Sequence, residues 1–353
     1  MNSPRKNDIP ILLRAYAREV TDRVPVWYMR QAGRYLPEYN EIRSDLSFME
    51  LVQNVDQATA VSLQPLRRFG LDGVIFFSDI LTPLHAAGID LHFEEKRGPV
   101  ITTIVEKASD LDRLRDFLPD RDCPYVGEIQ KRIRQTLGTG SERAALLGFA
   151  GAPFTLASYL WEGGTSRRFE RTKQILFGEP DFAHAVLERL VEITVAYLDF
   201  QLRSGAEAVQ IFDSWAGILR PEHYEEFAGR YTGQIIEQLR RRHPNPVILF
   251  VGNSAHLLGE MVAQSPQVIS LDWRVTPTEA ARMIPTQIAI QGNLDPLVLY
   301  GAPERVTRET LRILEAWGKR PGYVFNLGHG IHPSTPIENV TAMLEAVRAF
   351  RPS

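Results

Sequence analysis

The chain alternates between short apolar runs and longer stretches in which apolar residues recur at helical spacing. Short runs rich in β-branched and aromatic residues are typical of buried strands. Eight of them stand along the sequence: Val24–Met29, Gly73–Phe77, Ala144–Phe149, Ala208–Phe212, Val247–Val251, Val268–Leu271, Gln287–Ile290 and Tyr323–Asn326. Strand–helix alternation indicates parallel strands, and eight such units favour a single α/β domain over residues 1–353, a (β/α)8 TIM barrel. About residues 1–23 would lead into its first strand.

The stretches between the runs support this interpretation. Four of them carry a clear helical pattern: Phe48–Phe69, Phe182–Leu202, Pro221–Arg242 and Thr335–Phe350. A doubly wound open sheet is the alternative, but no predicted strand is followed by the G-x-G-x-x-G turn of that fold. The least regular part includes His85–Val105, which we expect to be an inserted hairpin or a long loop, with a candidate strand at Pro99–Val105.

Composition then narrows the function classes. The formal net charge is -3, so a general nucleic-acid binder is not expected. The only cysteine, Cys123, excludes an intrachain disulfide and a multi-cysteine metal site. No apolar stretch approaches the roughly 20 residues that cross a bilayer, and the basic N-terminal start precedes only a very short apolar run. We therefore expect a cytoplasmic protein with neither a membrane nor a nucleic-acid partner.

Polar and glycine residues gather after nearly every predicted strand. The segments are Met29–Gln31, Phe77–Asp79, Gly148–Phe154, Phe212–Trp215, Val251–Ser254, Asp272–Trp273, Gly292–Asp295 and Asn326–Gly330. In a parallel barrel the carboxyl ends of the strands meet at one face, where active sites lie. The opposite ends carry far fewer such residues, so the pattern favours an enzyme over a scaffold.

Two arginines, Arg30 and Arg34, follow the first predicted strand. Arginine stays charged at working pH, and its planar guanidinium matches carboxylates in bidentate geometry. The pair therefore suggests a site for a polyanionic ligand. Local ion pairs with Glu38 and Glu41 are the alternative.

Five further side chains follow other predicted strands, and most of them have more than one interpretation. Asp79 comes after a buried run, where a carboxylate meets either a structural arginine or a ligand. Tyr159 offers a ring and a hydroxyl suited to a large flat ligand, or it packs as a core tyrosine. Ser214 lacks the G-x-S-x-G setting of a nucleophile, which leaves a donor to a carboxylate or a helix cap, and Asp213 beside it is a cap, a second acid or a partner for an arginine. His329 lies between two glycines and titrates near neutrality, which core packing explains poorly.

Two long motifs identify the family that the chain resembles. PVWYMRQAGRYLPEY at Pro25–Tyr39 and GFAGAPFTLASYLWEGG at Gly148–Gly164 are similar to segments of the uroporphyrinogen decarboxylases of the haem pathway. Shorter matching segments follow in order along the chain: LQPLRRFGLDGVIFFSDIL at Leu63–Leu81, QIFDSWAG at Gln210–Gly217, LDW at Leu271–Trp273, QGNLDP at Gln291–Pro296 and NLGHGI at Asn326–Ile331. The resemblance implies a single (β/α)8 barrel, usually a homodimer, that uses no metal and no organic cofactor.

The resemblance also implies a reaction and a set of site residues. Enzymes of this family convert uroporphyrinogen III to coproporphyrinogen III by removing carbon dioxide from four acetate arms, which leaves methyl groups. By motif position, the residues that bind this tetrapyrrole are Arg30, Gln31, Arg34, Asp79, Tyr159, Ser214 and His329. Three of them, Asp79, Arg30 and His329, are implied to be catalytic, with Asp79 facing the pyrrole nitrogens.

Two expectations about ionisation follow from these assignments. Arg30 and Arg34, if they are near Asp79, should lower its pKa and keep it ionised beneath a cationic pyrrole. His329 has a suitable pKa for a general acid, whereas an arginine is a poor acid. Arg30 would then position the reacting acetate and its proton source, and a water held by Arg30 is a third possible donor.

One departure from the family pattern is visible after the fifth predicted strand. A lysine is expected there in a Phe-x-Lys pattern, but the segment Phe250–Ser254 contains none. Recognition of one outer carboxylate could therefore differ in this chain.

Two other functions stay open at this point. One is a cobamide-dependent methyltransferase of the same barrel type, which holds zinc through His and Cys ligands. It is weakened because Cys123 is the only thiol and lies outside the strand-end motifs. The other is a non-catalytic tetrapyrrole-binding protein, which would need the arginine pair but not Asp79.

Overall fold

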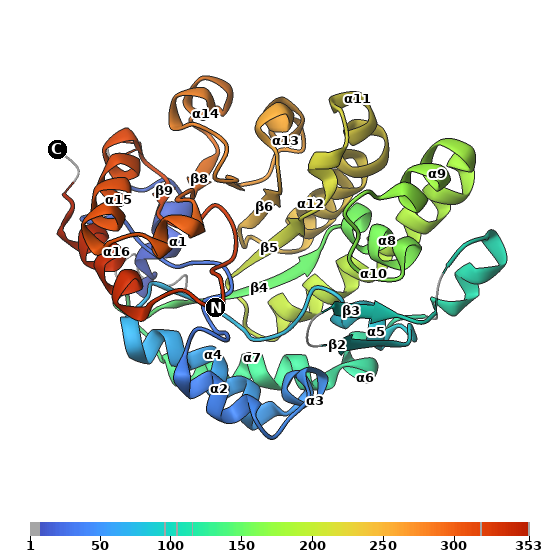
Figure 1. The fold of residues 1–353 in the computed structure, drawn as a ribbon, viewed down its shortest axis with the longest axis horizontal. Helices are drawn as coiled ribbons and strands as arrows, with labels where there is room; N and C mark the ends of the chain where they lie inside the picture. The colour runs from blue at the N-terminus through green and yellow to red at the C-terminus, as the bar shows by residue number, and fades with distance from the viewer. Residues whose placement is uncertain (1–7, 95–96, 104, 115, 318–319, 352–353) are drawn as a thin grey trace.

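The computed structural model describes residues 8–94, 97–103, 105–114, 116–317 and 320–351. Its centre is a curled sheet of seven parallel strands in the order β1-β4-β5-β6-β7-β8-β9 (Figure 1). The strands are β1 (Gly73–Ile75), β4 (Ala145–Gly151), β5 (Ala208–Asp213), β6 (Val247–Val251), β7 (Val268–Ser270), β8 (Ala289–Gln291) and β9 (Tyr323–Val324). Each overlaps a predicted run, so the α/β alternation and the parallel pairing are confirmed.

Helices surround the outside of this sheet (Figure 1). The α-helices are α1 (Ile11–Tyr16), α2 (Pro37–Arg43), α3 (Phe48–Gln53), α4 (Val55–Phe69), α5 (Thr82–Ala86), α6 (Pro119–Asp122), α7 (Pro124–Leu137), α8 (Pro153–Glu162), α9 (Glu170–Gly178), α10 (Pro180–Arg203), α11 (Pro221–Tyr224), α12 (Arg230–Arg242), α13 (Leu258–Ala263), α14 (Pro277–Met283), α15 (Pro303–Trp317) and α16 (Ile337–Ala349). Short 3-10 turns are η2 (Ala108–Arg113), η3 (Ala216–Ile218), η5 (Ala255–Leu257) and η6 (Pro296–Tyr300), and η4 (Glu225–Gly229) is a π turn.

Two of the predicted helices are divided. Phe48–Phe69 splits at Asn54, whose side chain accepts a hydrogen bond from the Gln57 N–H (3.1 Å) and so caps α4. Pro221–Arg242 contains the π turn between α11 and α12. The other two patterns, Phe182–Leu202 and Thr335–Phe350, correspond to α10 and α16.

The predicted first strand, Val24–Met29, is not a regular strand among the described residues, which corrects the expectation of eight strands. It makes one parallel bridge, between Val26 and Phe325 just beyond β9. On its other side the Val26 N–H donates to the Asp72 carboxylate (2.8 Å), and the Asp72 N–H donates to the Val26 carbonyl (2.9 Å). A side chain thus replaces a ladder partner, and Pro25 has no N–H to donate. The segment runs between β9 and β1 without a continuous ladder.

The irregular region forms the expected hairpin. Strands β2 (Leu91–Glu94) and β3 (Gly98–Ile101) pair in antiparallel fashion. The hairpin packs on the end of α8, because the Ile101 N–H donates to the Gly163 carbonyl (3.0 Å). The candidate strand Pro99–Val105 is therefore shorter than expected, and Ile104 lies outside the described residues, as do residues 1–7 of the leading segment.

A buried polar network crosses the inside of the curled sheet. The Gln291 amide donates to Gln210 Oε1 (3.1 Å) and to Ser270 Oγ (2.9 Å). Gln291 Oε1 accepts from the Tyr16 hydroxyl (2.5 Å) and from Trp27 Nε1 (2.9 Å). Buried polar groups are costly unless they are paired, so this network ties β5, β7 and β8 to helix α1.

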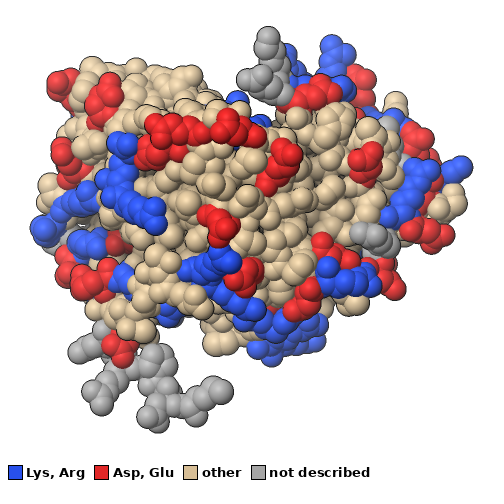
Figure 2. Space-filling model, turned by 90° about the horizontal axis from the view of Figure 1, so that it is seen from below, with Lys and Arg blue, Asp and Glu red and all other residues tan. Residues whose placement is uncertain are grey.

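The surface offers no dominant charge on the side seen in Figure 2. Lysine and arginine side chains are interspersed there with aspartate and glutamate side chains. This mixture agrees with the net charge of -3. Within the described ranges, no helix combines the length and the apolar character that crossing a bilayer requires.

Candidate active site

Arg30 lies at the carboxyl-terminal face of the sheet, in the loop after 24–29. Its backbone is left-handed (φ 60°), a conformation that few non-glycine residues adopt. A Cβ added to Gly330 would lie 2.4 Å from Cδ and 2.7 Å from Cγ of Arg30. The missing side chain at 330 therefore lets Arg30 lie against the loop that carries His329.

The charge of Arg30 acts on three of the predicted site residues. It lowers the pKa of Asp79 after β1, the pKa of Tyr159 on α8 and the pKa of His329 after β9. A charge has such an effect only on groups nearby. Three segments that are far apart in sequence thus bring these side chains together around one guanidinium.

The local ion pairs considered as an alternative for Arg30 and Arg34 do not form. Glu38 pairs with Arg68 instead, through two hydrogen bonds of 2.8 Å. In the part of the chain that the structure describes, neither Arg30 nor Arg34 makes an ion pair, and both are exposed. Two exposed cations without an ion pair among the described residues therefore lie in and just after the loop that follows 24–29.

Asp79 lies in the turn after β1, partly exposed. The Leu81 N–H donates to its Oδ1 (2.8 Å). Burial raises the pKa of Asp79, and this effect outweighs the Leu81 hydrogen bond and the charge of Arg30, both of which lower the pKa. The predicted net lowering of the Asp79 pKa is thus wrong, although the contribution of Arg30 has the expected sign, and Arg34 is not among the causes.

Tyr159 sits on α8 with its ring 6.0 Å from that of Trp215. Burial and the nearby Asp79 raise the pKa of Tyr159 to about 12, against the lowering by Arg30. Its hydroxyl is therefore protonated at neutral pH and can donate a hydrogen bond close to Asp79.

His329 follows β9 and is half-buried, and its ring packs edge-on against Phe250 (6.1 Å between centroids). Burial, helped by Arg30, lowers the pKa of His329 from 6.5 to about 4, and Asp272 acts in the opposite direction. The imidazole is neutral near pH 7, so the expectation of a well-matched general acid is wrong. The sequence could not show this, because the burial comes from tertiary packing.

The two remaining predicted residues are less directly joined to this group. Gln31 is buried, and its amide donates to the Gly73 carbonyl (3.1 Å), while its Oε1 has no partner among the described residues. This bond fixes the start of the Arg30 loop against β1. Ser214 is half-buried in the turn after β5, and none of the interactions described for the chain links its hydroxyl to the group around Arg30. The substrate-binding roles of both stay predictions.

Asp213, next to Ser214, is fully buried, and within the described ranges its side chain neither pairs with an arginine nor caps a helix. It accepts a hydrogen bond from the Thr155 hydroxyl (2.7 Å), and Thr155 Oγ1 accepts one from the Trp215 N–H (3.2 Å). Burial raises the pKa of Asp213 to about 7. Asp213 therefore anchors the turn that presents Ser214.

A row of aromatic rings crosses the sheet near the carboxyl ends of its strands, and the sequence analysis did not single it out. Neighbouring centroids lie 5.1 Å apart for Phe76 and Phe149, 5.8 Å for Phe149 and Phe212, and 5.8 Å for Phe212 and Phe250, which meets His329. The available signal was a phenylalanine late in each of four predicted strands. Rings of this kind suit the apolar faces of a large flat ligand.

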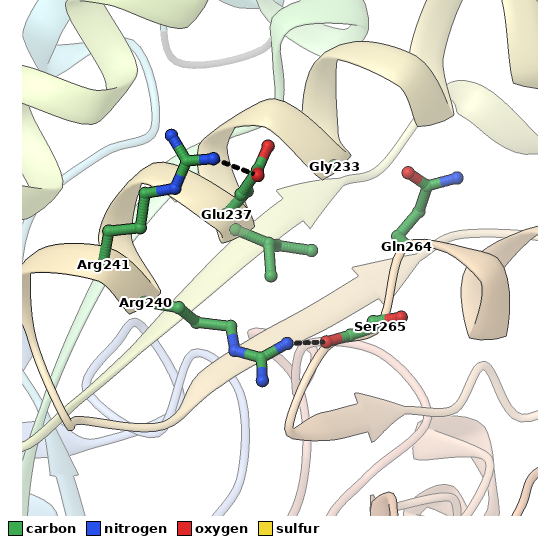
Figure 3. Close-up of a pocket in the computed structure, with 7 residues that line it drawn as sticks. Gly233, Glu237, Arg240, Arg241, Gln264 and Ser265 are labelled. Atoms are coloured by element: carbon green, nitrogen blue, oxygen red, sulfur yellow. Dashed lines mark hydrogen bonds and ion pairs between the residues drawn. The ribbon is translucent and has the colours of Figure 1, made fainter.

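The structure also holds a cavity away from these residues. It has a volume of about 390 Å³ and lies between α12 and the turn at Gln264–Ser265 (Figure 3). Arg240 Nη1 donates there to the Ser265 carbonyl (3.2 Å), and Arg241 pairs with Glu237 (2.5 Å). None of the predicted site residues lines it.

Metal ligation has no candidate cluster within the described ranges, where no three His, Cys, Asp or Glu side chains are grouped to hold an ion. Cys123 is buried between α6 and α7, and burial raises the pKa of its thiol to about 12. A buried thiol of this kind is inert.

Comparison with known proteins gives consistent results. Residues 8–350 match the uroporphyrinogen decarboxylase (URO-D) family. The uroporphyrinogen decarboxylase of Prochlorococcus marinus is 43% identical over 342 residues, which cover 96% of each chain, and that of Alkalilimnicola ehrlichii is 44% identical over 352 residues, which cover 98% of this chain and 95% of the relative. Among solved structures, a methyltransferase from Methanosarcina mazei matches with a TM-score of 0.77 and 21% identity over 96% of this chain and 97% of its own. That likeness shows a shared fold alone.

Proposed function

The chain belongs to the uroporphyrinogen decarboxylase family, and we propose that it removes carbon dioxide from the four acetate arms of uroporphyrinogen III at the carboxyl-terminal face of the sheet. The product is coproporphyrinogen III, and the reaction uses neither a metal nor an organic cofactor. One observation carries the proposal: Arg30, without an ion pair among the described residues, acts on Asp79, Tyr159 and His329 beside a row of aromatic rings.

The chemistry needs a place for the electron pair that carbon dioxide leaves behind. Many decarboxylases use a cofactor for this purpose. Here the pyrrole itself serves when a proton adds to its ring carbon next to nitrogen, which makes the ring cationic. Loss of carbon dioxide from the ionised acetate neutralises that cation and leaves an exocyclic methylene group. A second proton then adds to the exocyclic carbon to form the methyl group, and the ring carbon loses the first proton, which restores the neutral pyrrole.

Asp79 stabilises the cation. Because burial raises its pKa, the ionised carboxylate is poorly solvated in the free enzyme. A positive pyrrole next to Asp79 supplies the missing counter-charge. The attraction between the carboxylate and the pyrrole is therefore stronger in the cationic transition state than with the neutral substrate, which is what catalysis requires. Arg30 favours the ionised form of Asp79 until the substrate arrives.

The proton source is a water rather than His329. A histidine whose pKa lies near 4 is neutral at pH 7 and holds no acidic proton to transfer. An arginine is a poor acid, with a pKa above about 12. We assign to Arg30 the positioning of the reacting acetate and of that water, and to neutral His329 a hydrogen bond to the substrate.

The remaining residues bind the substrate. Exposed Arg34 and Arg30 supply cations for carboxylate arms, and the Tyr159 hydroxyl and Ser214 supply donors. Phe149, with the neighbouring rings, supports the apolar faces of the pyrroles.

The proposal extends to the architecture of the protein. Residues 1–353 form one domain, in which the 24–29 segment completes an eight-membered barrel; the hydrogen bonds of Val26 to Asp72 and of Trp27 to Phe325 support this. The enzyme is a cytoplasmic homodimer, a state that light scattering and cell fractionation would test.

The two alternative functions are less favoured. Relatives at 43–44% identity over nearly the full chain are decarboxylases, whereas the methyltransferase likeness concerns the fold alone. A non-catalytic binding protein would bind uroporphyrinogen III without releasing carbon dioxide, which the following experiment detects.

The test is anaerobic incubation of the purified protein with uroporphyrinogen III, followed by oxidation and separation of the porphyrins. Wild type is expected to give seven-, six- and five-carboxylate species and then coproporphyrin. Asp79→Asn should fold and lose activity by at least about 10²-fold. Asp181→Asn, which removes an exposed carboxylate in the first turn of α10, is the matched control and should stay active. A folded wild type that binds the tetrapyrrole but releases no carbon dioxide from it would contradict the proposal that the protein is an enzyme.

A further inference from the structure

Three residues that follow β7 form a fixed corner at the carboxyl-terminal face: Asp272, Trp273 and Arg274. The Asp272 side chain is 1% exposed. It accepts hydrogen bonds from the Asn253 N–H (3.1 Å), the Arg274 N–H (2.9 Å) and Arg274 Nη1 (3.2 and 3.1 Å to its two oxygens). A buried carboxylate with these donors is a rigid anchor for one edge of the guanidinium.

The rest of the guanidinium faces outward. Arg274 stacks on the Trp273 ring, with its Cζ 4.0 Å from the centroid, and its side chain is 46% exposed. Trp273 is itself 37% exposed. No hydrogen bond or ion pair between described residues uses Nε or Nη2 of Arg274. A guanidinium that is anchored on one side, stacked on a ring and free on another side is preorganised to bind a carboxylate.

The corner lies beside the proposed active site. A Cβ added to Gly328 would lie 2.3 Å from the backbone nitrogen of Trp273, so the loop that carries His329 packs directly against Trp273. The Asp272 charge is felt at His329, whose pKa it raises. Asn253, which binds the same carboxylate through its backbone, belongs to the segment where the family pattern predicts a lysine.

We propose that Arg274, stacked on Trp273 and held by Asp272, is a specificity-determining residue that binds one of the four substrate carboxylates that survive the reaction. The inference rests on the proposed function, because it concerns an arm of the same tetrapyrrole. Arg274 supplies at the outer rim the cation that the segment after β6 lacks. Arg30 lies against Gly330, and Trp273 lies against Gly328. The two sites therefore flank His329, and the arm at Arg274 is not the reacting acetate. We assign to Arg274 a surviving arm because every intermediate of the reaction carries all four of these carboxylates.

The experiment measures binding of two stable porphyrins by fluorescence, together with turnover of uroporphyrinogen III. Uroporphyrin carries eight carboxylates, and coproporphyrin carries only the four that survive. Arg274→Gln should weaken binding of both porphyrins by about tenfold, as expected for one charge-assisted pair at a partly exposed site. It should raise KM for uroporphyrinogen III by a similar factor and change kcat by less than about twofold. The reason is that the lost interaction stabilises the bound substrate and the transition state equally.

Arg240→Gln is the charge-matched control. Arg240 is near the end of α12, shortly before β6 begins, and so lies at the amino ends of the strands, opposite to the face of the proposed site. It should leave both affinities and KM unchanged. Equal effects of Arg240→Gln and Arg274→Gln would show that only the net charge of the protein matters, and would overturn the proposal that Arg274 binds a substrate carboxylate.

A purely structural role of Arg274 is tested with a double variant. If Arg274 only neutralises Asp272, then Asp272→Asn combined with Arg274→Gln should restore binding. If Arg274 contacts the substrate, the double variant stays weak. Weakened uroporphyrin binding with normal coproporphyrin binding would contradict the surviving-arm assignment, whereas a wild type without decarboxylation would contradict the proposed function instead.

Discussion

The environment of His329 predicts how the stability of the protein depends on pH. Burial and Arg30 lower its pKa from 6.5 to about 4 in the folded protein, whereas the unfolded chain keeps the ordinary value. Between these two values the unfolded chain binds a proton that the folded protein does not bind. The stability that neutral His329 provides is therefore fully present above about pH 6.5 and is lost as the pH falls toward 4.

The size of this effect follows from the two values. The difference of 6.5 - 4 = 2.5 corresponds to at most about 3 kcal/mol, at roughly 1.36 kcal/mol for each tenfold change in proton affinity. The perturbation is His329→Asn, which removes the titrating ring and keeps a polar side chain. Urea denaturation at pH 7.0 and at pH 4.5 should show that the wild type loses about 2 kcal/mol more than the variant does, because pH 4.5 still lies above the folded pKa.

Two controls separate this effect from general acid sensitivity. His92→Asn, at an exposed position on β2, should leave the pH dependence of the wild type unchanged. The histidine ring signals can also be followed by NMR, and the signal that His329→Asn removes should titrate near pH 4. A pKa near 6.5 for that signal, or equal losses in wild type and His329→Asn, would refute the reasoning. Because neutral His329 gives up no proton, the shape of the pH–rate profile between pH 5.5 and 8 should also stay the same in His329→Asn.

Three further substitutions test other parts of the structure. Gly330→Ala places a Cβ 2.4 Å from Arg30 Cδ, so steady-state kinetics should show kcat/KM reduced by about tenfold or more with an unchanged melting temperature. Asp72→Ala leaves the Val26 N–H without its partner and should cost about 2–4 kcal/mol of unfolding free energy in urea denaturation. Phe250→Leu removes one ring of the aromatic row and should raise KM by several-fold, with kcat changed less, in the same kinetic assay.

Much of the fold was predictable because it is encoded locally. Runs such as Val247–Val251 are apolar throughout, as strands buried on both faces must be, and the structure has β6 at the same residues. The segment Val24–Met29 has the same appearance. It does not form a ladder because the Val26 N–H donates to the Asp72 carboxylate, which belongs to a distant part of the sequence. Periodicity cannot detect such a competitor.

The motifs predicted which residues lie together in the candidate site better than they predicted the ionisation of those residues. Motif position named Arg30, Asp79, Tyr159 and His329, and the charge of Arg30 links all four in the structure. The expected lowering of the Asp79 pKa and the expected near-neutral pKa of His329 were wrong because burial dominates both, and burial depends on packing that no local pattern encodes. The row of rings that includes Phe212 escaped notice because an apolar residue in a strand is ordinarily assigned to the core.

The ionisation pattern has a consequence for the chemistry. At neutral pH, Tyr159 is protonated and His329 is neutral, so neither residue adds a charge to the group around Arg30. A protonated His329 would place a second cation beside the cationic pyrrole. Two like charges about 6 Å apart repel by about 3 kcal/mol at an effective dielectric constant near 20. The burial that lowers the pKa of His329 removes this repulsion. In the proposed mechanism, the packing that disqualifies His329 as an acid therefore also favours the cationic intermediate, and Arg34 and Arg274 are the cations proposed to hold the outer carboxylates.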